Sequence, residues 1–274
     1  GSDDILFAQI DTSANTVNFL DSALADDVVI STSGAVSTTG AFTANGTIKL
    51  DGNYPTGSDN VALGNTALDS VASNGNENTA IGNNALTAVT SADANTAVGQ
   101  NTLRSNLQSN NTAIGASAMC ANDNGYDNTA VGFFSLNKNT GGYQNTAVGN
   151  NSLCSNLSAD DGTAIGYNAL KSNTTANANT AVGSSALLSN TTASNNTAFG
   201  TETLKTTTTG CENVAVGRQA LRLNSTGDNN VAIGIYSLEA NTTADNNTAV
   251  GACTLLANTT GTANVAVGRL AMCS

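Results

Sequence analysis

The side chains that could carry out chemistry in this chain are carboxylates and thiols, because the sequence has no histidine and no tryptophan. The acidic pairs Asp26-Asp27 and Asp160-Asp161 come nearest to a catalytic or metal-binding cluster. A glycosidase needs two carboxyl groups that converge across a cleft, whereas adjacent acids are typical of solvated loops. Calcium beside Asp160-Asp161 is an alternative, but no complete calcium-loop motif is present there. We therefore expect that the chain has no catalytic residue, cofactor or metal, and that it is not an enzyme.

The cysteines are the other reactive groups, and no histidine accompanies them to complete a zinc site. Their odd number is unusual for an exported protein, because exported proteins usually pair their thiols. This favours assembly in a reducing cytoplasm with free thiols, and interchain disulfides are the alternative. The five cysteines are Cys120, Cys154, Cys211, Cys253 and Cys273.

The composition is not that of an ordinary globular protein. Only 10% of the residues are charged and 4% are aromatic, so apolar area must be buried in many small increments. This favours a fibrous or solenoidal fold. The net charge of −12 and the lack of a Lys/Arg stripe argue against nucleic-acid binding. No run of eighteen apolar residues is present, so we expect no membrane insertion.

A repeat organises most of the chain. The string Asn-Thr/Val-Ala-Val/Ile-Gly recurs thirteen times, and its glycines are spaced by 18, 17 and 16 residues and then nine times by 17. Such a regular period indicates one structural coil per repeat. We predict an all-β fold, a parallel β-roll or β-solenoid of about thirteen 17-residue coils over residues 60–274. Residues 1–59 are expected to form a β-rich linker or adapter, with strands over 5–8 and 27–31 and a helical turn over 22–25.

The columns of the repeat predict which side chains face inward. The residue before each glycine is apolar and the residue three before it is Thr or Val, and alternation puts both on one face of a strand. We interpret this face as inward, together with the Leu or Met four residues after the glycine. The invariant Ala between them would then face outward and pack against a second copy, which predicts a tightly packed or intertwined homotrimer. The proposed interface includes Ala97, Ala130, Ala147, Ala181, Ala215 and Ala249.

Glycine and asparagine mark the corners of the coil. An invariant glycine implies either a positive φ or a close approach to the next coil. Asn tolerates left-handed turns and can hydrogen-bond its own backbone, so two Asn columns, four residues before and seven after the glycine, predict two corners in each coil. Stacked Asn side chains can also form hydrogen bonds from coil to coil. The structural glycines include Gly99, Gly132, Gly149, Gly166, Gly183, Gly200, Gly217, Gly234 and Gly251.

The motif Asn-Thr/Val-Ala-Val/Ile-Gly-x-x-Ala/Ser-Leu over residues 60–274 resembles the head repeats of YadA-like trimeric autotransporter adhesins. The resemblance implies a left-handed parallel β-roll and a trimer. The period of 17 is longer than that of the family, which implies longer corner loops. Cysteine is also unusual in those adhesins.

The segment 33–48 is similar to the short strands that precede such repeats in bacteriophage tail fibres, with apolar and polar residues alternating between Gly34, Gly40 and Gly46. With the cysteines, it favours a virion tail fibre that contributes to binding a host-surface glycan or protein. The alternative is an adhesin head on a bacterial outer surface.

Large apolar residues near the glycines are the candidate receptor-binding surface. Phe133 and Tyr167 share a column two coils apart, about 10 Å by strand spacing, and could stack on sugar rings. The alternative is packing between protomers or under a loop. An ice-binding solenoid is a further hypothesis, but it requires the Thr column to face water. The full candidate set is Phe133, Phe134, Tyr167, Tyr126, Tyr143, Ile235 and Tyr236.

Overall fold

The computed structural model describes residues 8–11, 16–19, 58–72 and 74–273, and the chain forms two compact units, Gly1–Lys49 and Leu50–Ser274. In the first unit, β1 (Ala8–Asp11) and β2 (Thr16–Phe19) pair as antiparallel strands. The strand predicted over residues 5–8 shares only Ala8 with β1. The elements predicted over 22–25, 27–31 and 33–48 lie outside the described residues.

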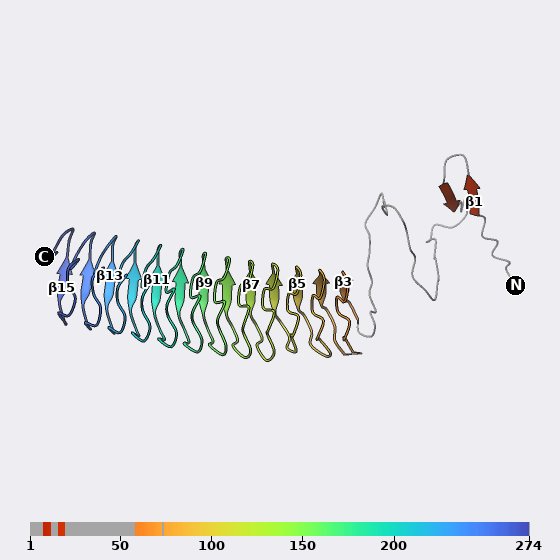
Figure 1. Cartoon of the computed structure of the whole chain (residues 1–274), viewed down its shortest axis with the longest axis horizontal. Helices are drawn as coiled ribbons and strands as arrows, with labels where there is room; N and C mark the ends of the chain where they lie inside the picture. Colours follow the sequence, from red (N-terminus) through yellow and green to blue (C-terminus); the bar gives the residue numbers. More distant parts are fainter. Residues whose placement is uncertain (1–7, 12–15, 20–57, 73, 274) are drawn as a thin grey trace. The chain divides into compact units, whose positions relative to one another are not determined.

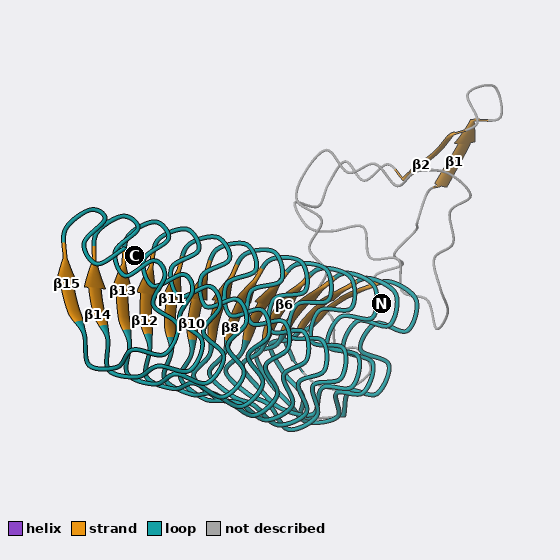
Figure 2. Cartoon of the chain, turned by 60° about the vertical axis from the view of Figure 1, so that its left-hand side comes forward, coloured by secondary structure: helices purple, strands orange, loops and turns teal. Residues whose placement is uncertain are grey.

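The second unit is a parallel β-solenoid, as the repeat predicts (Figure 1). Each of its thirteen strands pairs only with the strands before and after it in the sequence, and turns and loops complete every coil (Figure 2). The described part of the chain contains no helix. The strands are β3 (Val61–Leu63), β4 (Thr79–Ile81), β5 (Thr96–Val98), β6 (Thr112–Ile114), β7 (Thr129–Val131), β8 (Thr146–Val148), β9 (Thr163–Ile165), β10 (Thr180–Val182), β11 (Thr197–Phe199), β12 (Val214–Val216), β13 (Val231–Ile233), β14 (Thr248–Val250) and β15 (Val265–Val267).

Equivalent residues of successive coils are paired in register along the whole sheet. Between β7 and β8, for example, Ala130 is opposite Ala147. The same register holds from β3 to β6, although the coils there have spacings of 18, 17 and 16 residues. The extra and missing residues are therefore accommodated in the loops, and the strands stay aligned.

The core is built from alanine and leucine, which reverses the predicted orientation of the strands. From Ala80 to Ala249, every Ala of the central strand column is 0% exposed. These alanines form one apolar cluster with the Leu column, whose inward direction was predicted correctly. The Thr/Val and Val/Ile side chains that flank each Ala point outward; Ile165, for example, is 40% exposed.

The predicted Ala interface is therefore wrong. Its members lie inside their own coil and cannot contact another chain: Ala97, Ala130, Ala147, Ala181, Ala215 and Ala249. The column is restricted to Ala because the leucines already fill the narrow coil interior, and a close-packed interior has no room for a larger side chain.

The glycine column satisfies both conditions that the sequence suggested. At Gly149 φ is 133°, and a Cβ added there would lie 2.5 Å from the carbonyl oxygen of Gly166 in the next coil. Further positive φ angles occur in each coil, around Gly149 at Gln144, Asn151 and Leu153. The left-handed conformation occurs at these positions and not at the two Asn columns, so that part of the corner prediction is wrong. The second Asn column does bond its own backbone as predicted; Nδ2 of Asn139, for example, donates to the Gly142 carbonyl oxygen at 2.8 Å.

The Asn columns instead form two buried hydrogen-bonded ladders along the solenoid, which confirms the predicted bonding between coils. In the first ladder, the main-chain N–H of Asn145 donates to Oδ1 of Asn128 at 3.0 Å. In the second, Nδ2 of Asn156 donates to Oδ1 of Asn139 at 2.8 Å. Each ladder is interrupted once between its first and last members, by Gly162 in the first and by Thr207 in the second.

Candidate interaction surface

The outward face of the long sheet is the most extensive uniform surface in the described part of the chain. We call it the outer strip: the first and third side chains of every strand from β3 to β15. It consists only of Thr, Val, Ile, Leu and Phe, and it carries no charge. Neighbouring coils cover the flanks of these side chains, so most are partly exposed, up to 54% at Phe199 in the middle of the sheet.

The outer strip is one continuous surface along the whole sheet. Strands about 4.8 Å apart and about 3.3 Å per residue make it roughly 60 Å long and 10 Å wide, or about 600 Å². Nine of its 26 side chains are Thr, so its apolar area is smaller than this footprint and lies within the range of apolar patches that monomeric proteins expose, about 300–600 Å². The footprint approaches the roughly 800 Å² that each partner buries in a stable complex. A second surface along the strip would remove this area from water.

Aromatic residues lie beside the strip, or within it at Phe199, and take no part in the core. We call the position six residues before each glycine the leading rim, and the two positions after it the trailing rim. None of the seven aromatic side chains in the described part of the solenoid (residues 58–72 and 74–273) is buried, and five of them belong to the coils of β7, β8 and β9. The seven are Tyr126, Phe133, Phe134, Tyr143, Tyr167, Phe199 and Tyr236.

On the leading rim, Tyr126 and Tyr143 stack with their ring centroids 5.0 Å apart and an angle of 6° between the ring planes. The next coil places Asp160 at the same position, where its carboxylate accepts a hydrogen bond from the main-chain N–H of Tyr143 at 3.0 Å. The negative charge of Asp160, and hydrogen bonding to it, raise the pKa of the Tyr143 phenol above its ordinary value. The leading rim thus combines aromatic faces with a carboxylate.

We expect Asp160→Asn to lower the pKa of Tyr143 towards its ordinary value, because the substitution removes the charge but keeps a side-chain oxygen that can accept from the Tyr143 N–H. A difference absorbance titration of the phenolate, with Tyr143→Phe as the reference, measures the change. Asp161→Asn is the control and should shift the pKa less, because Asp161 is the weakest contributor. An unchanged pKa in Asp160→Asn would show that Asp160 is not the cause.

On the trailing rim, Phe133 and Phe134 meet edge to face, with centroids 4.1 Å apart. Tyr167 occupies the same column as Phe133 two coils further on, about 10 Å away, and is 56% exposed. Asn150 lies between them in this column and is exposed. This rim presents two aromatic side chains separated by an amide.

The predicted receptor-binding residues therefore fall into separate groups on one chain. Tyr126 and Tyr143 precede their strands, whereas Phe133, Phe134 and Tyr167 follow theirs. Ile235 and Tyr236 follow β13, six coils beyond Phe133, and the Tyr236 ring is 5.4 Å from the guanidinium of Arg218. Sequence reasoning did not identify the outer strip, although its uncharged composition was visible in the repeat.

The other reactive side chains of the described residues are cysteines and a few charged groups. All five cysteines are free, and burial raises the pKa of the Cys154 thiol, against the opposing charges of Lys138 and Lys171. Hydrogen bonding from Lys205 lowers the pKa of Glu202. No group of three His, Cys, Asp or Glu residues in the described ranges could hold a metal ion. In the same ranges, no helix is long and apolar enough to cross a membrane.

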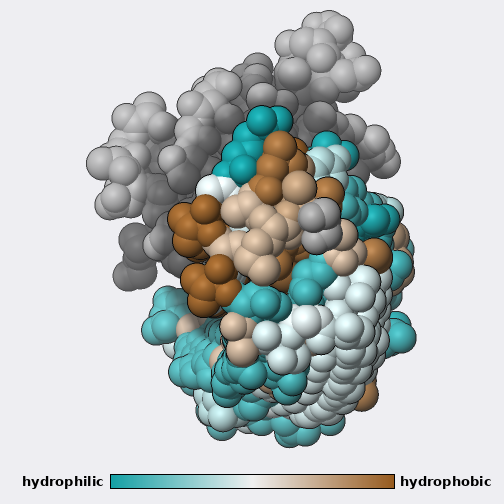
Figure 3. All heavy atoms as spheres, turned by 90° about the vertical axis from the view of Figure 1, so that its left-hand side faces the viewer, coloured by the Kyte–Doolittle hydropathy of each residue, from teal (hydrophilic) through white to brown (hydrophobic). Residues whose placement is uncertain are grey.

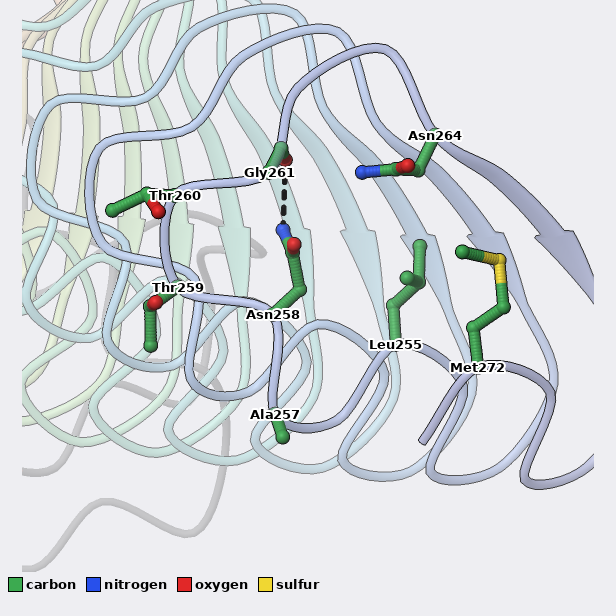
Figure 4. Close-up of a pocket in the computed structure, with 8 residues that line it drawn as sticks. All are labelled: Leu255, Ala257, Asn258, Thr259, Thr260, Gly261, Asn264 and Met272. Atoms are coloured by element: carbon green, nitrogen blue, oxygen red, sulfur yellow. Dashed lines mark hydrogen bonds between the residues drawn. The ribbon is translucent and has the colours of Figure 1, made fainter. Parts of the chain in front are cut away.

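The last coil contains a pocket that opens at the β15 end of the solenoid (Figure 4). It lies inside the coil, where Asn258 Nδ2 donates to the Gly261 carbonyl oxygen at 3.0 Å. From this end, apolar atoms are visible on the terminal coil (Figure 3). None of the residues lining the pocket is charged: Leu255, Ala257, Asn258, Thr259, Thr260, Gly261, Asn264 and Met272.

No family model, curated protein or solved structure matches the chain. The resemblance to adhesin heads and phage fibres therefore depends on the repeat and on the upstream segment alone.

Proposed function

We propose that the solenoid is a non-catalytic structural unit that assembles through the outer strip into a homotrimeric fibre. In this proposal the fibre is a segment of a virion tail fibre and contributes to attachment at the host surface. The observation that carries the proposal is the outer strip itself, an uncharged surface that runs along all thirteen strands. The head of a bacterial trimeric adhesin is the alternative context, since it would use the same architecture.

A second copy of the chain is the partner that best matches the length of the strip. A rotation axis parallel to the solenoid brings each strand level of one copy beside the same level of the next, so the uncharged Thr/Val and Val/Ile columns meet from β3 to β15. The strip contains only short side chains apart from Phe199, which suits close approach of two sheets. The expected number of three copies comes from the resemblance to trimeric adhesin heads.

We expect light scattering to give a solution mass near three times 27.2 kDa with the thiols kept reduced. The double variant Val148→Lys/Ile165→Lys should give folded single chains, because it puts two charges into the strip at β8 and β9. The matched control is Thr192→Lys, at an exposed position outside the strip and its rims, which should keep the assembled mass. A wild-type protein that is a folded single chain would refute the proposed assembly.

Ice binding is a second candidate, and the orientation of the Thr column favours it. The sequence interpretation placed this column inward, but the structure turns it outward beside the Val/Ile column in a regular array. The two functions compete for one surface, so the mass measurement separates them. A single chain that shows thermal hysteresis would support ice binding, and a trimer without hysteresis would exclude it.

A further inference from the structure

The aromatic residues of this chain are concentrated where they contribute nothing to the core. Aromatic side chains normally supply much of the buried area of a fold. Here all seven in the described part of the solenoid lie at the surface, and the cluster in the coils of β7, β8 and β9 is divided between the leading and trailing rims. A role outside folding explains why they are placed on the two edges of one strip.

The proposed assembly would bring these two edges together. A rotation about an axis parallel to the solenoid keeps every coil at its own height and places the leading rim of one copy beside the trailing rim of the next. This holds for any number of copies around such an axis. At the height of β7, Tyr126 of one copy then lies on the same side as Phe133 of its neighbour. At the height of β9, Asp160 lies on the same side as Tyr167.

We propose that each boundary between copies forms a binding site for a neutral carbohydrate at the level of β7 to β9. One wall of the site is the leading rim, with Tyr126, Tyr143 and Asp160. The opposite wall is the trailing rim of the next copy, with Phe133, Asn150 and Tyr167. The site is incomplete in a single chain, and the inference rests on the proposed assembly.

The chemistry of the two walls suits pyranose rings. Aromatic faces pack against the C–H faces of a sugar, while carboxylate and amide groups exchange hydrogen bonds with its hydroxyls. The two aromatic positions on the trailing rim are about 10 Å apart, enough to contact sugar units that are not adjacent in an extended chain. Neither rim carries Lys or Arg in these coils and the net charge is −12, which disfavours acidic sugars.

The binding test uses the assembled full chain with cellohexaose, chitohexaose and mannohexaose as probes. Without tryptophan, the intrinsic fluorescence of the protein comes mainly from its five tyrosines, so quenching by a probe that is lost when Tyr126 or Tyr167 is replaced reports contacts at the site. We expect at least one probe to bind, and Tyr126→Ala and Tyr167→Ala each to weaken it about tenfold. Tyr236→Ala, four coils beyond Tyr167, is the control and should leave the affinity unchanged. If none of the three probes binds, the carbohydrate assignment is overturned.

A mixing experiment tests whether the site crosses the boundary. One chain carries Tyr126→Ala/Tyr143→Ala and lacks the aromatic residues of the leading wall. The other carries Phe133→Ala/Tyr167→Ala and lacks those of the trailing wall. Trimers of either chain alone should not bind. Trimers refolded from both, and purified on two different tags, contain one intact boundary each and should regain binding with the wild-type affinity.

Two results would overturn the composite site: binding by either variant alone, or failure of the mixed trimers to bind. Exposed substitutions of this kind should leave the fold intact, and a thermal unfolding curve for each variant checks that they do. Light scattering on the same samples separates the two proposals. Trimers that fail to bind would refute only the carbohydrate site, whereas single chains would refute the assembly and the composite site together.

Discussion

Replacing Gly149 by alanine is expected to disrupt the middle of the solenoid and to lower the free energy of unfolding by at least about 3 kcal/mol. Two causes act together. The new Cβ would lie 2.5 Å from the main-chain oxygen of Gly166, and an L-residue would have to adopt a φ of 133°. The adjacent coil cannot move aside, because its strand is bonded to coils on both sides.

Two other glycines separate these causes. Gly268 has a φ of 117° but no atom within 4 Å of its Cβ position, so Gly268→Ala introduces strain without a clash. Gly141 has neither a positive φ nor a close neighbour, and Gly141→Ala should be neutral or slightly stabilising. Guanidinium unfolding followed by circular dichroism should show the largest loss of unfolding free energy for the Gly149 variant, a smaller loss for the Gly268 variant and the smallest change for the Gly141 variant. Equal stability of the Gly149 and Gly141 variants would contradict the close packing of successive glycines.

A substitution in the first buried Asn ladder should have the next largest effect on the free energy of unfolding. In Asn128→Ala, the main-chain N–H of Asn145 loses its acceptor, and the side chain of Asn145 loses one of its partners. A buried polar group without a partner costs about 1–3 kcal/mol. We expect a loss of roughly 2–3 kcal/mol, measured by the same denaturant titration.

The wild-type ladder already contains one gap of the kind that Asn128→Ala would introduce. Gly162 occupies the Asn column without a side chain, so the N–H of Asn179 has no acceptor among the described residues. We expect Gly162→Asn to join the two halves of the ladder and to raise stability by about 1–2 kcal/mol. Gly162 has no positive φ, but a Cβ added there would lie 2.8 Å from Oδ1 of Asn145, so the Asn145 side chain must shift slightly to admit the new residue. A Gly162→Asn protein that is no more stable than the wild type would contradict the expected gain.

The repeat allowed the architecture of the solenoid to be predicted from the sequence. The spacing of the glycines predicted the number of coils, and the Leu column was assigned correctly to the interior. Gly149 was expected to have a positive φ or a close contact, and it has both. These predictions succeed because each depends on one residue type with one physical requirement.

The orientation of the strand could not be obtained in the same way. Alternation shows which side chains share a face but not which face is inside. Thr/Val and Val/Ile columns have a core-like composition, and the constant Ala at positions such as Ala147 resembled a contact surface. The narrow interior of the coil decides that Ala, and not the Thr/Val and Val/Ile columns, faces inward. The width of this interior depends on where the strand and the Leu-bearing turn lie relative to each other. The distance between these two elements cannot be obtained from the order of residues alone.

The candidate surface was predicted only in part for a related reason. Phe133 and Tyr167 were correctly placed in one column, because they lie at the same distance from their glycines. Tyr126 and Tyr143 were grouped with them by sequence proximity, yet the three-residue strand and its flanking turns separate the two rims. Their stacking depends on the path of the corner loop, which the repeat does not define.

Because coils of unequal length keep the same strand register, the length of the solenoid depends on the number of its coils. Spacings of 18 and 16 residues occur beside spacings of 17, yet no strand leaves its register. Because each strand pairs only with its two neighbours, we expect a coil that is inserted or deleted to change the length of the solenoid by about 4.8 Å. Length then depends on repeat number, while the position of the aromatic rims along the rod depends on which repeats carry them.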